Sequence, residues 1–119
     1  MTGRFPRRVF DTGTEPDPRF TLANERTFLA WTRTSLALIA AGVALEALAL
    51  PLQPTLRLIA SLILLVLGIV VPPLAWVTWG SVERALRQGS PLPSSRVALP
   101  LAVGIALAGT ILVAGLLLR

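Results

Sequence analysis

The sequence contains no cysteine and no histidine among its 119 residues. It therefore lacks thiolate nucleophiles, thiolate and imidazole metal ligands, disulfides and the general base that many enzymes use. These absences argue against an enzyme, and we expect no metal site and no cofactor. A role in binding or in membrane organisation is the alternative that the composition leaves.

Charged residues are also scarce. They make up 14% of the chain, all 11 basic residues are arginine, and the formal net charge is +5. Spread over a soluble surface, such a basic excess would suggest nucleic acid as a partner. Here the arginines flank apolar segments instead, so we expect the lipid bilayer to be the partner and expect no nucleic-acid binding.

Hydrophobic residues are abundant. They form 54% of the chain, and the mean hydropathy of +0.73 is too high for a water-soluble domain of this size. Three apolar stretches, at residues 27–52, 58–79 and 97–118, are each long enough for a helix to cross a hydrocarbon core of about 30 Å. The sequence predicts an all-α membrane protein in which residues 17–119 form a bundle of three transmembrane helices.

The first 16 residues mix arginine, proline, glycine and acidic residues without periodicity, which predicts a disordered tail over residues 1–16. Asp17 followed by Pro18 is a favourable pair for the N-cap and first position of a helix. We therefore expect one helix to begin there and to continue into the first span.

The distribution of arginine predicts the orientation in the membrane. Cytoplasmic segments of membrane proteins are enriched in basic residues, and interfaces are enriched in tryptophan. One side carries eight arginines and the other carries two, so we expect a cytoplasmic N-terminus and tail, a C-terminus outside, and Trp31, Trp76 and Trp79 at the cytoplasmic interface. The eight are Arg4, Arg7, Arg8, Arg19, Arg26, Arg84, Arg87 and Arg96, and the two are Arg57 and Arg119.

Arg26 and Arg33 lie seven residues apart at the start of the first span, and therefore share one helix face. Small side chains allow close helix packing in lipid, so we expect this face to point toward other helices or a central axis. Arg33 either snorkels to the headgroups or helps to bind an anion through its permanently charged guanidinium. Glu25 adjoins the face and could neutralise one arginine. The face continues through Ala30, Ala37, Ala40, Ala41 and Ala44.

Arg84 and Arg87 follow the second span on a short helical extension from Ser81 to Gln88. Residues in such positions usually enforce orientation and contact anionic lipid. They could also extend a basic entrance formed by Arg26 and Arg33. The candidate anion-binding residues are therefore Arg26, Arg33, Arg84 and Arg87.

Two further features lie inside the spans. Glu46 is costly in lipid, and it falls at the same depth as Arg57 on the adjacent antiparallel helix, so we predict that the two pair as a staple of the hairpin. Pro72 and Pro73 predict a kink, because they remove backbone donors to two carbonyls. Pro72 and Pro73 fall at about the depth of Arg33 on the adjacent helix, so Arg33 could donate to the freed carbonyls.

The segment NERTFLAWTRTSLALIAAGVALE, from Asn24 to Glu46 and including Glu25 and Trp31, resembles the YidH-like family of small bacterial inner-membrane proteins. The later WGSVERALRQG segment resembles it more weakly. The family is classed as a domain of unknown function, number 202. The resemblance implies three membrane helices and a multi-pass location in the inner (plasma) membrane, and it supplies no established activity.

The same signature resembles the membrane domain of the fungal vacuolar transporter chaperone complex, which makes polyphosphate and translocates it through an oligomeric pore lined by basic residues. Glu25, Arg26 and Arg33 match the acidic and basic positions of that motif less completely than those of the bacterial family. The soluble polymerase and phosphate-sensing domains are missing here, so the resemblance does not extend to polymerisation.

Two hypotheses follow. In the first, the chain is a homo-oligomeric module whose Arg26 and Arg33 face binds or conducts polyphosphate or another anion, because one three-span chain cannot enclose a passage. In the second, it is a structural or regulatory subunit that packs beside a larger membrane partner and transports nothing. The arginines also make anionic lipid a possible ligand.

Overall fold

The computed structural model describes residues 4–119, and these residues form four helices and no strand. The helices are α1 (Arg7–Phe10), α2 (Pro18–Ala47), α3 (Pro54–Gln88) and α4 (Ala98–Leu117). The three longer ones have the length and hydropathy to cross a membrane. This confirms the all-helical class with three candidate spans.

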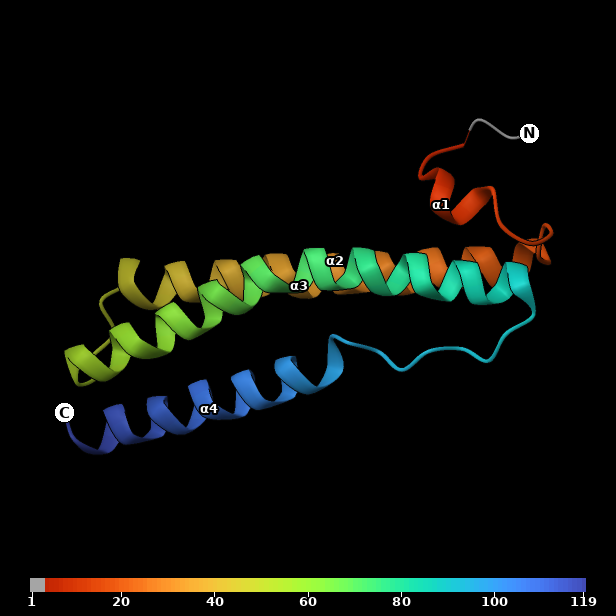
Figure 1. The fold of residues 1–119 in the computed structure, drawn as a ribbon. Coiled ribbons are helices and arrows are strands. Elements are labelled where there is room, and N and C mark those ends of the chain that lie inside the picture. Colours follow the sequence, from red (N-terminus) through yellow and green to blue (C-terminus); the bar gives the residue numbers. More distant parts are fainter. Residues whose placement is uncertain (1–3) are drawn as a thin grey trace.

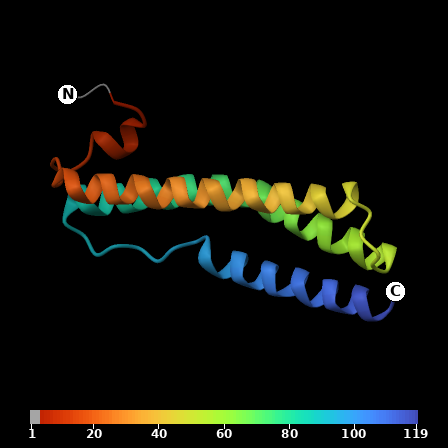
Figure 2. The same ribbon diagram turned by 180° about the vertical axis from the view of Figure 1, so that it is seen from behind.

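The N-terminal half of α3 lies between α2 and α4, and its C-terminal half overlaps α2 in both views (Figures 1 and 2). Both α2 and α4 pack against α3, and within residues 4–119 they do not pack against each other. The three predicted membrane helices are therefore arranged as an open layer, in which α3 contacts both of the others. On α4, the small residues Gly104, Ala108 and Gly115 lie on one face of the helix, and this face packs against α3. In the described part of the chain, no second face of α4 packs against α2.

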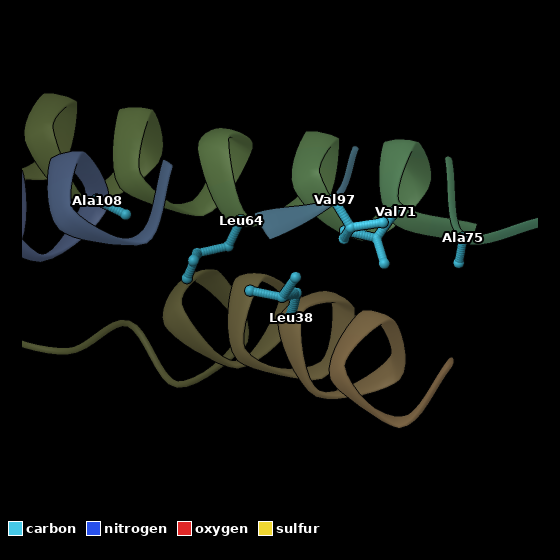
Figure 3. Packing of buried hydrophobic residues seen from close by; sticks show 6 residues of the cluster. All are labelled: Leu38, Leu64, Val71, Ala75, Val97 and Ala108. Atoms are coloured by element: carbon cyan, nitrogen blue, oxygen red, sulfur yellow. The ribbon is translucent and has the colours of Figure 1, made fainter. Parts of the chain in front are cut away.

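The apolar core runs along the two helix contacts that α3 makes. Leu38 of α2 packs near Leu64 of α3, whereas Val97, just before α4, packs near Val71 (Figure 3). Ala75 and Ala108 complete this cluster of buried residues. Because α3 contributes to both contacts, it is the element on which the other two long helices depend.

The helices differ in length, and the difference creates a protruding end. At about 1.5 Å per residue, α4 is about 30 Å long, which matches a hydrocarbon core, whereas α2 and α3 reach about 45 Å and 52 Å. The α2–α3 turn and the C-terminus lie at the same end (Figure 1). The excess length therefore lies at the other end, which we call the basic end and define as residues 4–26 and 80–96.

The ends of α2 and α3 follow from local capping. Asp17 caps α2 as predicted: the side chain and the backbone N–H of Arg19 both donate to its carboxylate, which holds the pKa of that carboxyl below its usual value. The helix ends at Ala47, short of residue 52, where the first span was predicted to end. Ala49 has a φ of 47°, which an α-helix does not accommodate. The side chain of Gln53 caps α3 by accepting from the backbone N–H of Leu56.

The second predicted span and the short extension that follows it form one helix. α3 runs through Pro72 and Pro73 and ends at Gln88. Gly89 caps this end with a φ of 68°, which glycine readily adopts. Figures 1 and 2 show the two halves of α3 running in different directions, as a proline-induced bend would produce.

The N-terminal segment differs from the disordered tail predicted over residues 1–16. Residues 1–3 lie outside the described part of the chain, but residues 4–16 include α1 and pack against α3. Phe5 stacks on Trp76 and Phe10 contacts Trp79, while Val9 is buried. The order comes from these contacts between distant parts of the chain, which local periodicity does not reveal.

Candidate functional site

Arg26 and Arg33 lie on the face of α2 that points away from α3. The buried residues of α2 are Asn24, Ser35, Leu38 and Gly42, and at 100° per residue both arginines lie about 180° from them. Both are exposed, and within residues 4–119 neither guanidinium forms an ion pair or a hydrogen bond. Glu25 is exposed as well and neutralises neither arginine in this chain. The outward face, called the Arg26/Arg33 face below, comprises Arg26, Ala30, Arg33, Ala37, Ala40, Ala41 and Ala44.

Arg87 does not belong to a free basic surface. Only 5% of it is exposed, and its guanidinium donates to the carbonyls of Thr12 and Phe10, each at 2.8 Å. It also pairs with Glu15 at 3.2 Å. Its backbone carbonyl accepts from the N–H of Thr14. These contacts with the N-terminal segment occupy the Arg87 guanidinium, so Arg87 is not free to bind an anion as the sequence predicted.

Gly13 allows this docking. It has a φ of 58°, and a Cβ at this position would overlap the backbone carbonyl of Arg87. Both the backbone conformation and the close approach favour glycine. The segment from Phe10 to Glu15 is therefore shaped to wrap around the end of α3 at Arg87.

Arg84 lies apart from the other candidates. It lines a cavity together with Arg8, which belongs to α1, and Arg96, which precedes α4. The four predicted anion-binding arginines therefore occupy three places: two on the outward face of α2, one in this cavity and one buried beneath the N-terminal segment.

A polar cluster that the sequence analysis missed lies between α2 and α3 at the basic end. Glu83 is 1% exposed and accepts from the hydroxyl of Thr21 at 3.0 Å. Asn24 donates through Nδ2 to the backbone carbonyl of Trp79 at 3.0 Å and, at 3.5 Å, to Glu83. Asn24 thus connects α2 to α3 through its side-chain amide. Its three-residue spacing from Thr21 on a predicted helix was the signal that could have indicated a shared polar face.

Two serines join α2 and α3 deeper in the membrane. Ser35 donates to the carbonyl of Gly68 at 2.5 Å, and Ser61 donates to the carbonyl of Gly42 at 2.6 Å. Each helix thus supplies one serine donor and one glycine acceptor. All four residues are buried, so the contact fixes the register of the two helices.

The first of these bonds corrects the role predicted for Arg33. Pro72 lacks the backbone N–H that would donate to the Gly68 carbonyl within α3, and Ser35 supplies the missing donor. Arg33 lies on the opposite face of α2 and makes no contact with the freed carbonyls. Serine is the residue of this region that both faces α3 and can donate.

We predict that Ser35→Ala destabilises the α2–α3 contact by about 1 kcal/mol, because the Gly68 carbonyl loses its donor in lipid. Pro72→Ala restores a backbone donor to the same carbonyl, so Ser35→Ala should cost less in that background. Unfolding in mixed micelles with a denaturing detergent, run as a double-mutant cycle, measures the difference.

Ser61→Ala provides the matched control for that cycle. Its acceptor, Gly42, has no proline four residues later, so Pro72→Ala should leave the cost of Ser61→Ala unchanged. An equal cost of Ser35→Ala in both backgrounds would show that Pro72 and Ser35 do not share an acceptor.

The predicted pair of Glu46 and Arg57 is present. Arg57 Nε donates to the Glu46 carboxylate at 3.3 Å, and its Nη1 donates to the Leu50 carbonyl at 2.8 Å. The pair closes the turn between α2 and α3. Farther toward the N-terminus of α2, Trp31 packs partly buried against the core cluster.

The geometry described so far offers no metal centre. Among residues 4–119 no group of three or more acidic side chains is placed to hold a metal ion. The arrangement consists of buried polar contacts that hold helices together and exposed arginines that lack counter-charges. A guanidinium group presents several donors and a permanent positive charge, which is the chemistry that an anion requires.

Comparison with known proteins places the chain in a family. Residues 19–85 match the family model described as a domain of unknown function, DUF202. The chain belongs to this family. The matched residues cover most of α2 and α3, including Arg26, Arg33 and the serine–glycine contacts, and stop before α4.

Named relatives cover almost the whole chain. The chain is 44% identical over 104 residues to an uncharacterized protein of Mycobacterium tuberculosis, with 87% of this chain and 85% of the relative aligned. It is 38% identical over 112 residues to the inner membrane protein YidH of Escherichia coli, with 93% and 96% aligned. YidH of Shigella flexneri matches equally well. No solved structure matches the chain.

These relatives and the three apolar helices identify the DUF202 chain as a small protein of the bacterial inner membrane. The relatives' names state no enzymatic activity.

Proposed function

We propose that the chain is an oligomeric module of the inner membrane, in which the Arg26/Arg33 face of each copy surrounds a common axis. That axis binds or conducts polyphosphate or another phosphate-type anion. The observation that carries the proposal is Arg33, an exposed arginine within an apolar helix, opposite the face that packs on α3 and without an acidic partner in residues 4–119.

The depth of Arg33 determines how costly its charge would be in lipid. Ser35, two residues later, contacts Gly68, and the nearby Val71 packs with Val97 at the start of α4. Arg33 thus lies at about the level where α4 enters the membrane. A charge facing hydrocarbon is costly, by about 2.5–3.5 kcal/mol at a helix centre and less near the edge. Facing a hydrated axis shared by several copies removes that cost.

The open layer of helices also favours several copies. A single row of three helices encloses nothing, so a passage requires neighbouring chains. The outward face of α2 carries alanines between and beyond its arginines, and these allow another helix to approach closely. The resemblance of this segment to the membrane domain of the fungal polyphosphate complex supports polyphosphate as the anion.

The proposal includes the orientation. Eight arginines lie toward the basic end and two lie toward the opposite end, which favours a cytoplasmic basic end and a C-terminus outside. Anions would then enter from the cytoplasm, past Arg26 first and Arg33 next. No catalytic step is part of the proposed function.

A second candidate function is that of a structural or regulatory subunit. The observation that favours it is the exposed small-residue surface of α4, where Ala102, Ala106 and Gly109 are all exposed. Such a surface suits close packing against a helix of a larger membrane protein. In this case the chain itself would conduct no anion.

The experiment is polyphosphate uptake into proteoliposomes with the N-terminal side facing the medium. We expect the protein to support uptake, and Arg33→Gln to reduce the rate about tenfold or more, because the charge that offsets the anion in low dielectric is lost. Native mass spectrometry of the same samples reports the copy number. Arg119→Gln is the matched control, since it removes one exposed arginine at the opposite end.

Uptake that is equal for the protein, for Arg33→Gln and for empty liposomes contradicts the passage. A monomer that copurifies with a larger membrane protein would then favour the subunit. An oligomer that loses uptake in Arg33→Gln but keeps its copy number would support the proposal.

A further inference from the structure

A second basic site lies on the surface of the basic end, where three segments distant in sequence meet. A cavity of about 380 Å³ is lined by α1, by the last third of α3 and by the connection before α4. Each of the three segments contributes one arginine. The lining residues are Arg8, Val9, Trp76, Val77, Gly80, Ser81, Arg84 and Arg96.

The three arginines have no counter-charge in the chain. Within residues 4–119, the guanidinium groups of Arg8, Arg84 and Arg96 form no ion pair and no hydrogen bond, and no carboxylate lines the cavity. This contrasts with Arg4, Arg19, Arg57 and Arg87, each of which pairs with an acidic residue. Three cations that converge on one cavity repel one another unless an anion lies between them.

The cavity lies at the level of the membrane interface. Arg96 precedes α4 by two residues, and α4 has the length of the hydrocarbon core. On the wall that α3 forms, Trp76 and Val77 are 45% and 44% exposed. Tryptophan side chains favour this level of the bilayer. The site thus combines three arginines with an apolar wall, at the depth where headgroups lie.

We propose that this cavity binds a phosphate group, either in the headgroup of an anionic phospholipid or in a free phosphate compound. Arginine binds phosphate oxygens in a bidentate manner, and the hydroxyl of Ser81 offers a further donor at the same wall. The apolar wall formed by Trp76 and Val77 suits the part of a lipid next to its headgroup. This site is separate from the Arg26/Arg33 face, so neither proposal depends on the other.

The N-terminal segment is part of the site, because it carries Arg8. Arg87 and Gly13 hold that segment against α3, and therefore they position Arg8 without lining the cavity. Arg7, the preceding residue, is exposed and does not line the cavity. The chain thus offers a matched pair of neighbouring arginines, one inside the site and one outside it.

The test uses the full chain in phosphatidylcholine nanodiscs, in two arms. In the first arm the nanodiscs also contain phosphatidylglycerol, and native mass spectrometry measures the lipid that each protomer retains. In the second arm, inorganic phosphate is titrated into nanodiscs without anionic lipid, and tryptophan fluorescence follows binding because Trp76 lines the cavity. The variants are Arg8→Gln, Arg96→Gln and the control Arg7→Gln, all at exposed positions where no structural contact is lost.

We expect Arg8→Gln and Arg96→Gln each to weaken binding about tenfold or more, since each removes charged donors to the phosphate. Arg7→Gln should leave it within about twofold. A loss confined to the first arm identifies a lipid headgroup, and a loss confined to the second identifies a free phosphate compound. Equal binding by the protein and all three variants in both arms would overturn the proposal.

Discussion

Gly68→Val is expected to destabilise the contact between α2 and α3 by about 3 kcal/mol, the upper end of what overpacking costs. A Cβ at Gly68 would lie 2.5 Å from Cγ1 of Ile39 and 3.1 Å from the backbone carbonyl of Ser35. The isoleucine can rotate, but the backbone of α2 can move only if the helices separate. Separation also breaks the hydrogen bond from Ser35 to the Gly68 carbonyl.

Unfolding in mixed micelles with a denaturing detergent measures this effect. Gly109→Val is the control, because it makes the same change in a membrane helix where nothing lies within 4 Å of the added Cβ. Gly109→Val should leave the stability of the α2–α3 contact nearly unchanged. Equal effects of the two substitutions would mean that helix propensity, and not the close approach at Gly68, governs the result.

Arg87→Gln is expected to release the N-terminal segment from α3. The substitution removes a buried cation that donates to two backbone carbonyls and pairs with Glu15. Losing even one hydrogen bond to a charged group costs about 2 kcal/mol. Cleavage by trypsin after Arg7 and Arg8 should therefore become about 30-fold faster, because cleavage depends on how often the segment opens.

The matched control is Arg84→Gln, which removes an exposed arginine three residues earlier on the same helix. The Arg84 guanidinium forms no hydrogen bond or ion pair with residues 10–15. Its cleavage rate should stay within about threefold of that of the unaltered protein. Gly13→Ala tests the same docking from the other side, since the added Cβ would overlap the Arg87 carbonyl. Slow cleavage of both Arg87→Gln and Gly13→Ala would contradict the role of Arg87 as the anchor.

The sequence was sufficient to predict the features that depend on local pattern. The number of long apolar helices follows from hydropathy and length, the start of α2 follows from Asp17 and Pro18, and the end of α3 follows from Gly89. The ion pair of Glu46 and Arg57 was also predictable, because a short turn between antiparallel helices fixes which residues share a depth.

Features that depend on which helix faces meet were not predictable in the same way. Ser35 and Ser61 look like ordinary membrane-helix residues until the register of α2 against α3 is known. Arg87 looks like an exposed cation of a helix end, and only the path of the N-terminal segment shows that it is buried. The cavity with Arg8, Arg84 and Arg96 joins three segments that no spacing connects.

The anchoring of the N-terminal segment at Arg87 has a consequence for how the chain inserts into the membrane. Residues 10–15 and Arg87 can meet only on the same side of the bilayer, and two crossings, α2 and α3, separate them along the chain. If either helix failed to cross, the parity of crossings would change and the two groups would lie on opposite sides. Docking therefore excludes every chain in which one of the two helices has failed to cross, and it can form only after α3 has been synthesised.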